Sequence, residues 1–140
     1  MDTDAHRLVM LYESMKNKRR VSKVVIINND KILLMQKNGS LKWELPGGHV
    51  LPKEDMVKGA CREVREETGI KLDPEFLEKI DSSKSSGYKC KWYRYDLPVK
   101  QKIKMSDEHV NYKWVAKNKL DDYELSNSTN HLAIVSSYGG

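Results

Sequence analysis

The segment GHVLPKEDMVKGACREVREETGI, residues 48–70, brings four glutamates and two arginines into one short stretch of the chain. A charged run of this kind most often forms a solvated helix face, on which each salt bridge contributes only about 0.3 kcal/mol. The alternative is a metal site built from carboxylates. The flanking residues favour the metal site, because a glycine turn and an isolated glutamate precede the run and a glycine follows the acidic pair directly.

The apolar residues of this segment predict a helix from about Asp55 to Thr68. Asp55 can cap its N-terminus, and Gly69 stands where a left-handed C-cap ends a helix. The apolar positions that share one side are Met56, Val57, Ala60, Cys61 and Val64.

The opposite side of the predicted helix gathers carboxylates. Residues three and four apart share a helix face, so Glu63, Glu66 and Glu67 converge, and Glu54 lies at the helix entrance. Three carboxylates in one patch repel unless cations neutralise them, and oxygen ligands in this number suit Mg²⁺ or Mn²⁺. Arg62 can pair with Glu66 and reach back to Glu54.

The segment resembles the signature of the Nudix hydrolases, GX5EX7REUXEEXGU, where U is a bulky apolar residue. Gly48 is followed by five residues and Glu54, and seven more residues lead to the run 62–70. Every defined position is met, which is far more specific than a short glycine motif. The strands before it, the LPGG turn and the later strand ending in KWV also look similar to the family, so the resemblance covers most of a single predicted domain, residues 1–140.

Two residues inside the signature depart from common family choices at positions where any residue is permitted. Lys53 stands where many members have glycine, and Gly59 replaces a common helical alanine at a cost of about 1 kcal/mol. Neither departure removes a ligand. They bear on the loop shape and on the helix stability.

The resemblance implies a fold and a reaction. The fold is an α+β protein of the α/β/α sandwich type, with a mixed sheet between helices. The reaction is the hydrolysis of a phosphoanhydride bond in a nucleoside diphosphate linked to another moiety. Bound Mg²⁺, or Mn²⁺, neutralises phosphate oxygens in such reactions and lowers the pKa of its water.

The resemblance also implies roles for residues. The metal ligands are Glu63, Glu66, Glu67 and the carbonyl of Gly47. Glu54 and Arg62 orient the site.

The general base is left open by the resemblance. It is either a glutamate of the signature or a carboxylate on a later loop, where Glu108, with Asp107 beside it, is the natural choice. An exposed loop acid without a catalytic role is an equally good interpretation of Glu108. The two nearby histidines, His49 and His109, are interpreted as incidental.

The substrate is indicated only weakly. Tyr88 lies 18 residues past the signature, as in many dinucleoside polyphosphate hydrolases of the family. The proline that marks ADP-ribose pyrophosphatases is absent, since Ser85 and Ser86 stand there. Trp43 is expected to line the nucleotide pocket and Lys42 and Lys91 to meet phosphates, although sheet packing is the favoured explanation for most of the aromatic residues.

Other substrates and functions remain open at this stage. The substrate alternatives are ADP-ribose or another nucleotide sugar or dinucleotide, nucleoside triphosphates and capped RNA, the last favoured by the lysine-rich stretch 100–104. A nucleotide-binding sensor without turnover is disfavoured by the retained glutamates. An isomerase acting on a prenyl diphosphate needs an acid and a thiol, which are not identified here.

The remaining elements complete the predicted order helix, strands, loop, helix, strands, helix. A helix is expected over 3–16, and a hairpin from VSKVVIIN and KILLMQK with a turn at Asn29 and Asp30. Trp43 lies in a short strand and a loop follows at Pro46–Gly48. Later strands are FLEKIDSS, YKCKWYRYDL and VNYKWV, with the loop SSKSSG between the first two, and TNHLAIVSSY is a closing helix.

Composition narrows the class of protein. The 140 residues fit one domain, and the net charge of +5 is compatible with anionic partners without choosing among them. Two distant cysteines indicate neither a disulfide framework nor a zinc site, so a cytoplasmic location is expected. No membrane segment is predicted, and the chain is expected to be a monomer or a homodimer.

Overall fold

The computed structural model describes residues 5–9, 19–85 and 87–126. Its strands are β1 (Arg19–Asn28), β2 (Lys31–Lys37), β3 (Trp43–Glu44), β4 (Gly47–Val50), β5 (Glu78–Ser85), β6 (Tyr88–Asp96) and β7 (His109–Ala116). Helix α2 (Met56–Thr68) and the short 3-10 helices η1 (Pro74–Phe76) and η2 (Lys117–Asp122) connect them. Residues 5–9 are helical, whereas the rest of the predicted helix 3–16 and the predicted closing helix 129–138 lie outside the described residues.

The strands form one mixed sheet, which confirms the predicted α+β class. The order along its main path is β3-β2-β1-β6-β5, with β4 added to β1 and β7 added to β2. β1 and β6 run parallel, and the other pairings are antiparallel. The predicted hairpin is confirmed, and its turn residues Asn29 and Asp30 have φ of 51° and 60°, as a type I′ turn requires.

The hairpin strands separate soon after this turn. β1 and β2 pair only at Ile27 with Ile32 and at Asn28 with Lys31. The earlier part of β1 pairs instead with β4, and β2 pairs with β3 and β7. The sheet is therefore split between its two hairpin strands, and the split opens beside Lys23.

The prediction of a loop through Gly48 was wrong, because Gly47 and Gly48 belong to β4. Gly47 lies opposite Lys23 in the register with β1. Its φ is +132°, and a Cβ there would lie 2.1 Å from the carbonyl oxygen of Ser22. The glycine therefore permits a close strand pairing that a side chain would prevent.

Helix α2 has the predicted bounds. The Asp55 carboxylate accepts hydrogen bonds from the backbone N–H groups of Val57 and Lys58, each at 3.0 Å. Gly69 ends the helix with φ of 77°, and its N–H donates to the carbonyl of Arg65 at 2.8 Å. Both helix ends thus have the caps that the sequence predicts.

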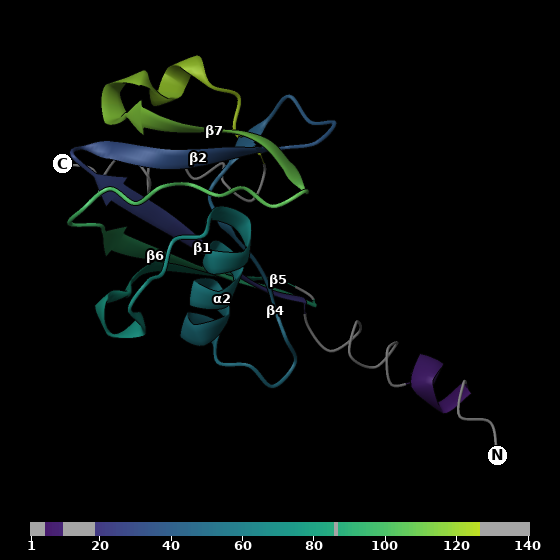
Figure 1. The fold of residues 1–140 in the computed structure, drawn as a ribbon. Helices are drawn as coiled ribbons and strands as arrows, with labels where there is room; N and C mark the ends of the chain where they lie inside the picture. Colours follow the sequence, from purple (N-terminus) through teal and green to yellow (C-terminus); the bar gives the residue numbers. More distant parts are fainter. Residues whose placement is uncertain (1–4, 10–18, 86, 127–140) are drawn as a thin grey trace.

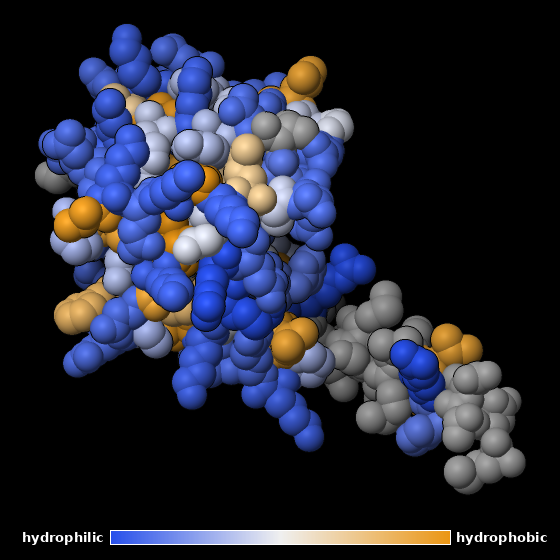
Figure 2. Space-filling view, viewed as in Figure 1, coloured by the Kyte–Doolittle hydropathy of each residue, from blue (hydrophilic) through white to orange (hydrophobic). Residues whose placement is uncertain are grey.

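Two buried clusters lie on the two faces of the sheet. Val24 and Ile26 of β1 pack with Ala60 and Val64 of α2, which covers this face (Figure 1). The outer surface on this side is mostly hydrophilic, with apolar residues appearing singly (Figure 2). The alternate β1 residues, including Val25, face the second cluster with Leu120 of η2. This alternation is the period of two expected of a strand that is buried on both faces.

The predicted boundaries after α2 were partly wrong. Phe76 lies in η1, not in a strand. β5 continues to Ser85 and β6 begins at Tyr88, so the expected loop SSKSSG is mostly strand. The serine and lysine side chains of this segment are exposed on a strand whose one partner among the described strands is β6. A polar edge strand of this kind shows no apolar alternation that would reveal it.

Candidate active site

The split in the sheet and the adjacent end of α2 enclose a cleft of about 670 Å³. Three parts of the molecule line this cleft. The helix wall is Glu63, Glu66 and Glu67; the sheet wall is Arg19, Val21, Lys23, Lys37, Glu44 and Tyr88; the rim loop is Ser106, Asp107 and Glu108. Gly47, Gly48 and His49 of β4 lie between the two walls.

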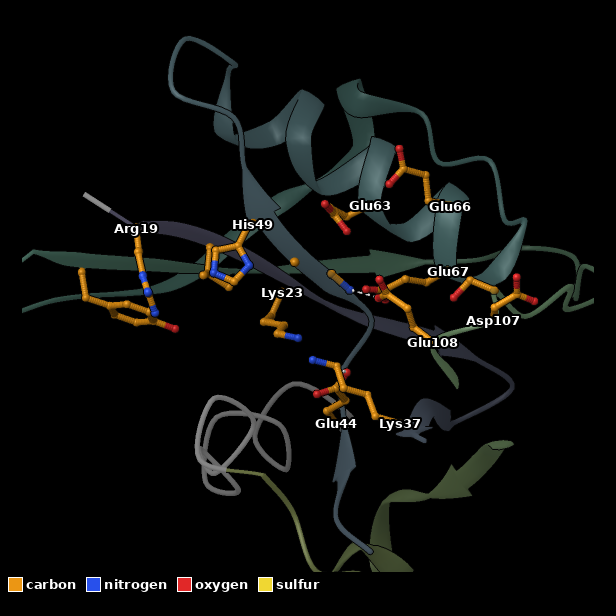
Figure 3. A pocket seen from close by; sticks show the side chains of 15 residues that line it. Arg19, Lys23, Lys37, Glu44, His49, Glu63, Glu66, Glu67, Asp107 and Glu108 are labelled. Atoms are coloured by element: carbon orange, nitrogen blue, oxygen red, sulfur yellow. Dashed lines mark hydrogen bonds and ion pairs between the residues drawn. The ribbon is translucent and has the colours of Figure 1, made fainter. Parts of the chain in front are cut away.

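Figure 3 shows a separation of charge along this cleft. The helix wall lies together with Asp107 and Glu108 at one side. Arg19 and His49 lie toward the other side, and Lys23 stands between the two groups. Cations for an anionic ligand and carboxylates for a metal ion are thus held in one cleft.

The glutamates of the helix wall differ in their environment. Glu67 is only 6% exposed, and its Oε2 accepts a hydrogen bond from the N–H of Gly47 at 3.0 Å. Glu63 lies against the backbone of Gly48, where a Cβ would come within 2.6 Å of its Oε2. Glu66 is exposed over 59% of its side chain. The two glycines of β4 therefore let the helix carboxylates approach the strand closely.

Arg62 links Glu54, at the entrance of α2, to the helix wall through hydrogen bonds. Its Nε donates to Glu54 Oε2 at 2.8 Å and one terminal nitrogen donates to Oε1 at 3.0 Å. The other terminal nitrogen donates to Glu63 at 3.1 Å and to Glu66 at 3.2 Å. The carbonyl of His49 accepts a further bond at 3.1 Å. This hydrogen bonding lowers the pKa of Glu54 and raises that of Arg62, so both stay charged.

Burial dominates the electrostatics of Glu67. It raises the pKa of this carboxyl to about 7, against the opposing charge of Lys23 and the hydrogen bond from Gly47. A buried carboxylate is stabilised when a cation binds beside it. A cation bound beside Glu67 would therefore offset the cost of burying its charged form.

A buried polar group lies behind the sheet wall. His109 is buried, and its Nε2 lies 3.2 Å from Glu44 Oε1 and its Nδ1 lies 3.4 Å from Ser106 Oγ. Lys37 Nζ lies 3.8 Å from the same Glu44 oxygen. Burial, the largest influence, acts to raise the pKa of Glu44, but the hydrogen bond from His109 and the charges of Lys23 and Lys37 together lower it.

The rim loop is attached to both sides of the cleft. The N–H of Ser106 donates to the carbonyl of Glu67 at 3.2 Å, and the carbonyl of Glu108 accepts from the N–H of Asn38 at 3.0 Å. The Asp107 and Glu108 side chains are exposed and line the cleft. The structure thus brings the predicted loop acids and the helix glutamates to one cleft.

Of the four predicted substrate residues, the structure places Tyr88 in the cleft and the other three outside it. Tyr88 lines the cleft, opposite Arg19 in the parallel pairing of β6 with β1. Lys91 does not, because it lies on the face of β6 that alternates away from Tyr88. Trp43 packs edge-on against Tyr123, with ring centroids 5.6 Å apart, and Lys42 is exposed outside the cleft. Adjacent strand residues face opposite ways, so Glu44, and not Trp43, reaches the cleft.

The fit of the helix wall to a divalent cation depends on its donor atoms and on their spacing. Within the described residues no three acidic, histidine or cysteine side chains stand close enough to hold a metal ion as they lie. Arg62 donates hydrogen bonds to Glu63 and Glu66 in this arrangement. The donors are nevertheless all oxygen atoms, as Mg²⁺ prefers, and Glu66 is exposed enough to turn toward the cleft. The absence of a side chain at Gly48 lets the Glu63 carboxylate lie at the cleft, since a Cβ there would come within 2.6 Å of its Oε2. The residues present therefore fit the ion.

Several residues of the cleft were missed by the sequence interpretation, namely Arg19, Lys23, Lys37, Glu44 and Ser106, while His109 was dismissed as incidental. One signal was available for Lys23. Lys23 interrupts the run VSKVVIIN, and all the residues from Val21 to Ile27 are buried. A lysine in such a strand is rare unless it is paired or functional.

Comparisons with known proteins identify the family and the fold. A sequence model described as the NUDIX domain matches residues 17–133. The crystal structure of a MutT NUDIX hydrolase from Burkholderia pseudomallei has the same fold, with a TM-score of 0.71 and 22% identity over 84% of this chain and 95% of that one.

Two curated relatives are more similar in sequence over shorter regions. A MutT-like protein of Streptomyces ambofaciens is 32% identical over 51% of this chain and 49% of its own length. The asymmetrical bis(5'-nucleosyl)-tetraphosphatase of Mus musculus is 31% identical over 60% of this chain and 62% of its own length. The chain spans about half the length, or less, of the first curated relatives it matches. No helix among the described residues is long and apolar enough to cross a membrane.

Proposed function

The chain belongs to the Nudix hydrolase family, and on this premise we propose that its cleft hydrolyses a phosphoanhydride bond in a nucleoside diphosphate linked to another moiety. The observation that carries the proposal is the meeting of the helix wall with Arg19, Lys23 and Lys37 in one cleft. A phosphoanhydride has several negative oxygens, and a site that cleaves it must neutralise them. The cleft offers side-chain cations on one wall and metal ligands on the other.

The helix wall would hold Mg²⁺, or Mn²⁺, through Glu63, Glu66 and Glu67, with the Gly47 carbonyl as a further ligand. When bound, the ion supplies neutralisation of the phosphate oxygens and a water of lowered pKa. Gly47 also holds Glu67 in place through its N–H, at 3.0 Å. The close approach of β4 to α2 is therefore part of the binding site itself.

Arg62 and Glu54 would position the reacting groups without touching the substrate. The two hydrogen bonds between them, at 2.8 and 3.0 Å, fix the loop before α2 against the helix. Arg62 also screens the repulsion between Glu63 and Glu66. Positioning of this kind matters because a displacement of about 1 Å can slow a reaction about a hundredfold.

The general base would be Glu108 or a glutamate of the helix wall. Glu108 is exposed on the rim loop, where its carboxylate can accept a proton from a water in the cleft. Asp107 is adjacent and lines the same cleft. The alternative bases are Glu63 and Glu66. Replacing Glu108 by Gln distinguishes them, since only a base role makes the rate of the chemical step depend on that carboxylate.

Dinucleoside polyphosphates are the leading substrate. Arg19 and Lys23 are four residues apart on β1, about 13 Å, and Tyr88 stands beside Arg19. A long polyphosphate chain can lie between them, with a base stacked on Tyr88, a contact of about 1 to 3 kcal/mol where measured. The mouse tetraphosphatase among the relatives supports this choice. ADP-ribose and other nucleotide sugars or dinucleotides are the second choice, followed by nucleoside triphosphates and capped RNA.

The experiment is a turnover assay with Mg²⁺ across a substrate panel. The panel holds dinucleoside tri- and tetraphosphates, ADP-ribose, NADH, FAD, nucleoside triphosphates and capped RNA, with products resolved by chromatography. Glu67→Gln is the inactive variant, and Glu78→Gln, an exposed glutamate of β5 outside the cleft, is the matched control. We expect one preferred substrate, an at least hundredfold loss in Glu67→Gln and no change in Glu78→Gln.

A different result assigns the cleft to nucleotide sensing. If the wild-type protein cleaves no member of the panel but binds a nucleotide, the helix wall is not a working catalytic site.

We also propose a cytoplasmic location, because Cys61 and Cys90 are both free thiols and a reducing compartment keeps them so.

A further inference from the structure

Lys23 is a buried cation in the middle of a strand. It is 5% exposed, and its neighbours on the same face of β1, Val21 and Val25, belong to the second apolar cluster. An ammonium group is costly to bury unless hydrogen bonds and opposite charges compensate it. The position therefore needs an explanation that packing does not supply.

The hydrogen bonds that Lys23 forms within the described residues do not use all the N–H donors of its ammonium group. Its Nζ donates one hydrogen bond, to the carbonyl oxygen of Leu45 at 3.2 Å. An ammonium group has three N–H donors. No ion pair within 4.0 Å is formed by Lys23 in the described part of the chain, whereas Lys37, Arg62 and Arg94 each form at least one.

The nearby carboxylates are occupied by other groups. Glu44 is held by His109 at 3.2 Å and by Lys37 at 3.8 Å. Glu67 accepts from Gly47, and in the proposed function it binds a metal ion. Lys23 is thus close enough to both glutamates to act on them through its charge, but neither is its hydrogen-bond partner.

The position of Lys23 relative to the helix wall is set by the sheet. Lys23 lies opposite Gly47 in the register of β1 with β4, and Gly47 carries the N–H that binds Glu67. In Figure 3 the Lys23 side chain extends into the cleft between the helix wall and Arg19. Any anion that bridges the helix wall and the sheet wall passes this ammonium group.

We propose that Lys23 is a phosphate-binding residue, which donates to a phosphate oxygen of a substrate held against the helix wall. The inference rests on the proposed function and deepens it, because it identifies which cation meets the phosphate chain beside the metal ligands. Surroundings of low polarity strengthen such a charge-assisted bond. Lys42 and Lys91, which the sequence indicated for this role, lie outside the cleft.

A phosphate-binding lysine and a structural lysine respond differently to removal of the charge. If Lys23 serves the ligand, an apolar side chain of similar length makes the unliganded protein equally stable or more stable, because the burial cost disappears. If Lys23 serves the fold, the same change lowers stability.

The experiment uses Lys23→Met and the polar Lys23→Gln, with Lys84→Met as the matched control on exposed β5. Calorimetry measures the binding of inorganic tripolyphosphate with Mg²⁺, thermal unfolding measures Tm without ligand, and the preferred panel substrate gives KM. We expect tripolyphosphate binding weakened roughly 10- to 100-fold in both Lys23 variants and KM raised likewise, with Tm unchanged or higher. Lys84→Met should match the wild type in all three.

Two results overturn the proposal. One is wild-type tripolyphosphate affinity in either folded Lys23 variant, and the other is a failure of both variants to fold, since the proposal gives the ammonium no structural role. Glu67→Gln separates this failure from that of the proposed function. If Glu67→Gln loses turnover while Lys23→Met keeps its KM, only the role of Lys23 is wrong. If the wild type cleaves no substrate of the panel, the proposed function fails, whether or not the protein binds tripolyphosphate.

Discussion

The helix wall and the sheet wall of the cleft are built in opposite ways. Glu63, Glu66 and Glu67 come from one turn of α2 and from five consecutive residues of the chain. Lys23, Lys37 and Glu44 of the sheet wall come from three different strands and meet only because the sheet brings β1, β2 and β3 together. The first wall is encoded by helical spacing, the second by strand topology.

The two walls also differ in the interactions that hold their side chains in place. The helix wall is stabilised by Arg62, which is partly exposed and holds its glutamates through charged hydrogen bonds. The sheet wall depends on buried partners, since the His109 side chain is 0% exposed. We therefore expect changes in the helix wall to affect activity more than folding, and changes behind the sheet wall to affect folding as well.

After Glu67 itself, the largest effect is expected at Arg62. Arg62→Ala should lower kcat/KM about a hundredfold, because Glu54, Glu63 and Glu66 lose their common partner and the ligand geometry shifts. Arg62→Lys should lose almost as much, since a lysine cannot form the forked pair with Glu54. Steady-state kinetics on the preferred substrate measures both variants.

Arg65→Ala is the matched control, because Arg65 is an exposed arginine of the same helix that does not line the cleft. It should keep the wild-type kcat/KM. Wild-type activity in Arg62→Ala would contradict the claim that the helix wall depends on this one cation.

A smaller effect, on stability, is expected at His109. His109→Ala should lower the free energy of unfolding by about 2 kcal/mol, because Glu44 is left buried without its hydrogen-bond donor. Denaturant unfolding at neutral pH measures this loss. His49→Ala is the control, since the hydrogen bond between His49 and Arg62 uses the backbone carbonyl of His49, and this variant should unfold like the wild type.

The pH dependence of unfolding sharpens this prediction. The folded pKa of Glu44 lies below its ordinary value of 4.5, so its contribution to stability is present above that pH and is lost as the pH falls below it. Removing the His109 donor raises the folded pKa of Glu44. The loss of stability on acidification should therefore be smaller in His109→Ala, because the folded and unfolded pKa values of Glu44 then lie closer together. Identical pH profiles would show that the pair does not hold the sheet wall.

The smallest effect is expected at Gly59, where helix propensity and packing disagree. Alanine is favoured over glycine in a helix by about 1 kcal/mol. In this helix, however, a Cβ on Gly59 would lie 3.0 Å from Glu54 Oε1 and from both Val50 methyl groups. Crowding of this kind is destabilising, so Gly59→Ala should gain nothing and lose up to about 1 kcal/mol.

The adjacent exposed position supplies the control for Gly59. Lys58→Ala should be more stable than Lys58→Gly by about 1 kcal/mol, as measured by denaturant unfolding. A similar gain in Gly59→Ala would contradict the close packing of the loop before α2 against the helix.

The sequence predicted the local parts of this molecule well. Asp55 and Gly69 cap α2 as expected, and the turn at Asn29 and Asp30 has the expected positive φ values. These features depend on residues a few positions apart. The pairing of Arg62 with Glu66 and Glu54 was also predictable, because the helical repeat brings the first two together and the signature places the third.

The nonlocal parts were not predictable from one sequence. Gly47 belongs to β4 because Lys23 of β1 lies beside it, and no local pattern reveals that pairing. His109 seemed incidental until the sheet placed Glu44 within 3.2 Å. Trp43 and Lys91 were assigned to the substrate without knowing which strand face the cleft occupies, and both lie away from it.

The most direct test of the central claim is hydrolysis in H₂¹⁸O, measured with and without Mg²⁺ for the wild type, Glu67→Gln and Glu78→Gln. The account predicts that ¹⁸O enters one phosphate of a nucleotide product, that this requires Mg²⁺, and that Glu67→Gln alone loses it at least a hundredfold. Labelled product formed equally well by Glu67→Gln, or formed by the wild type without a divalent cation, would contradict it.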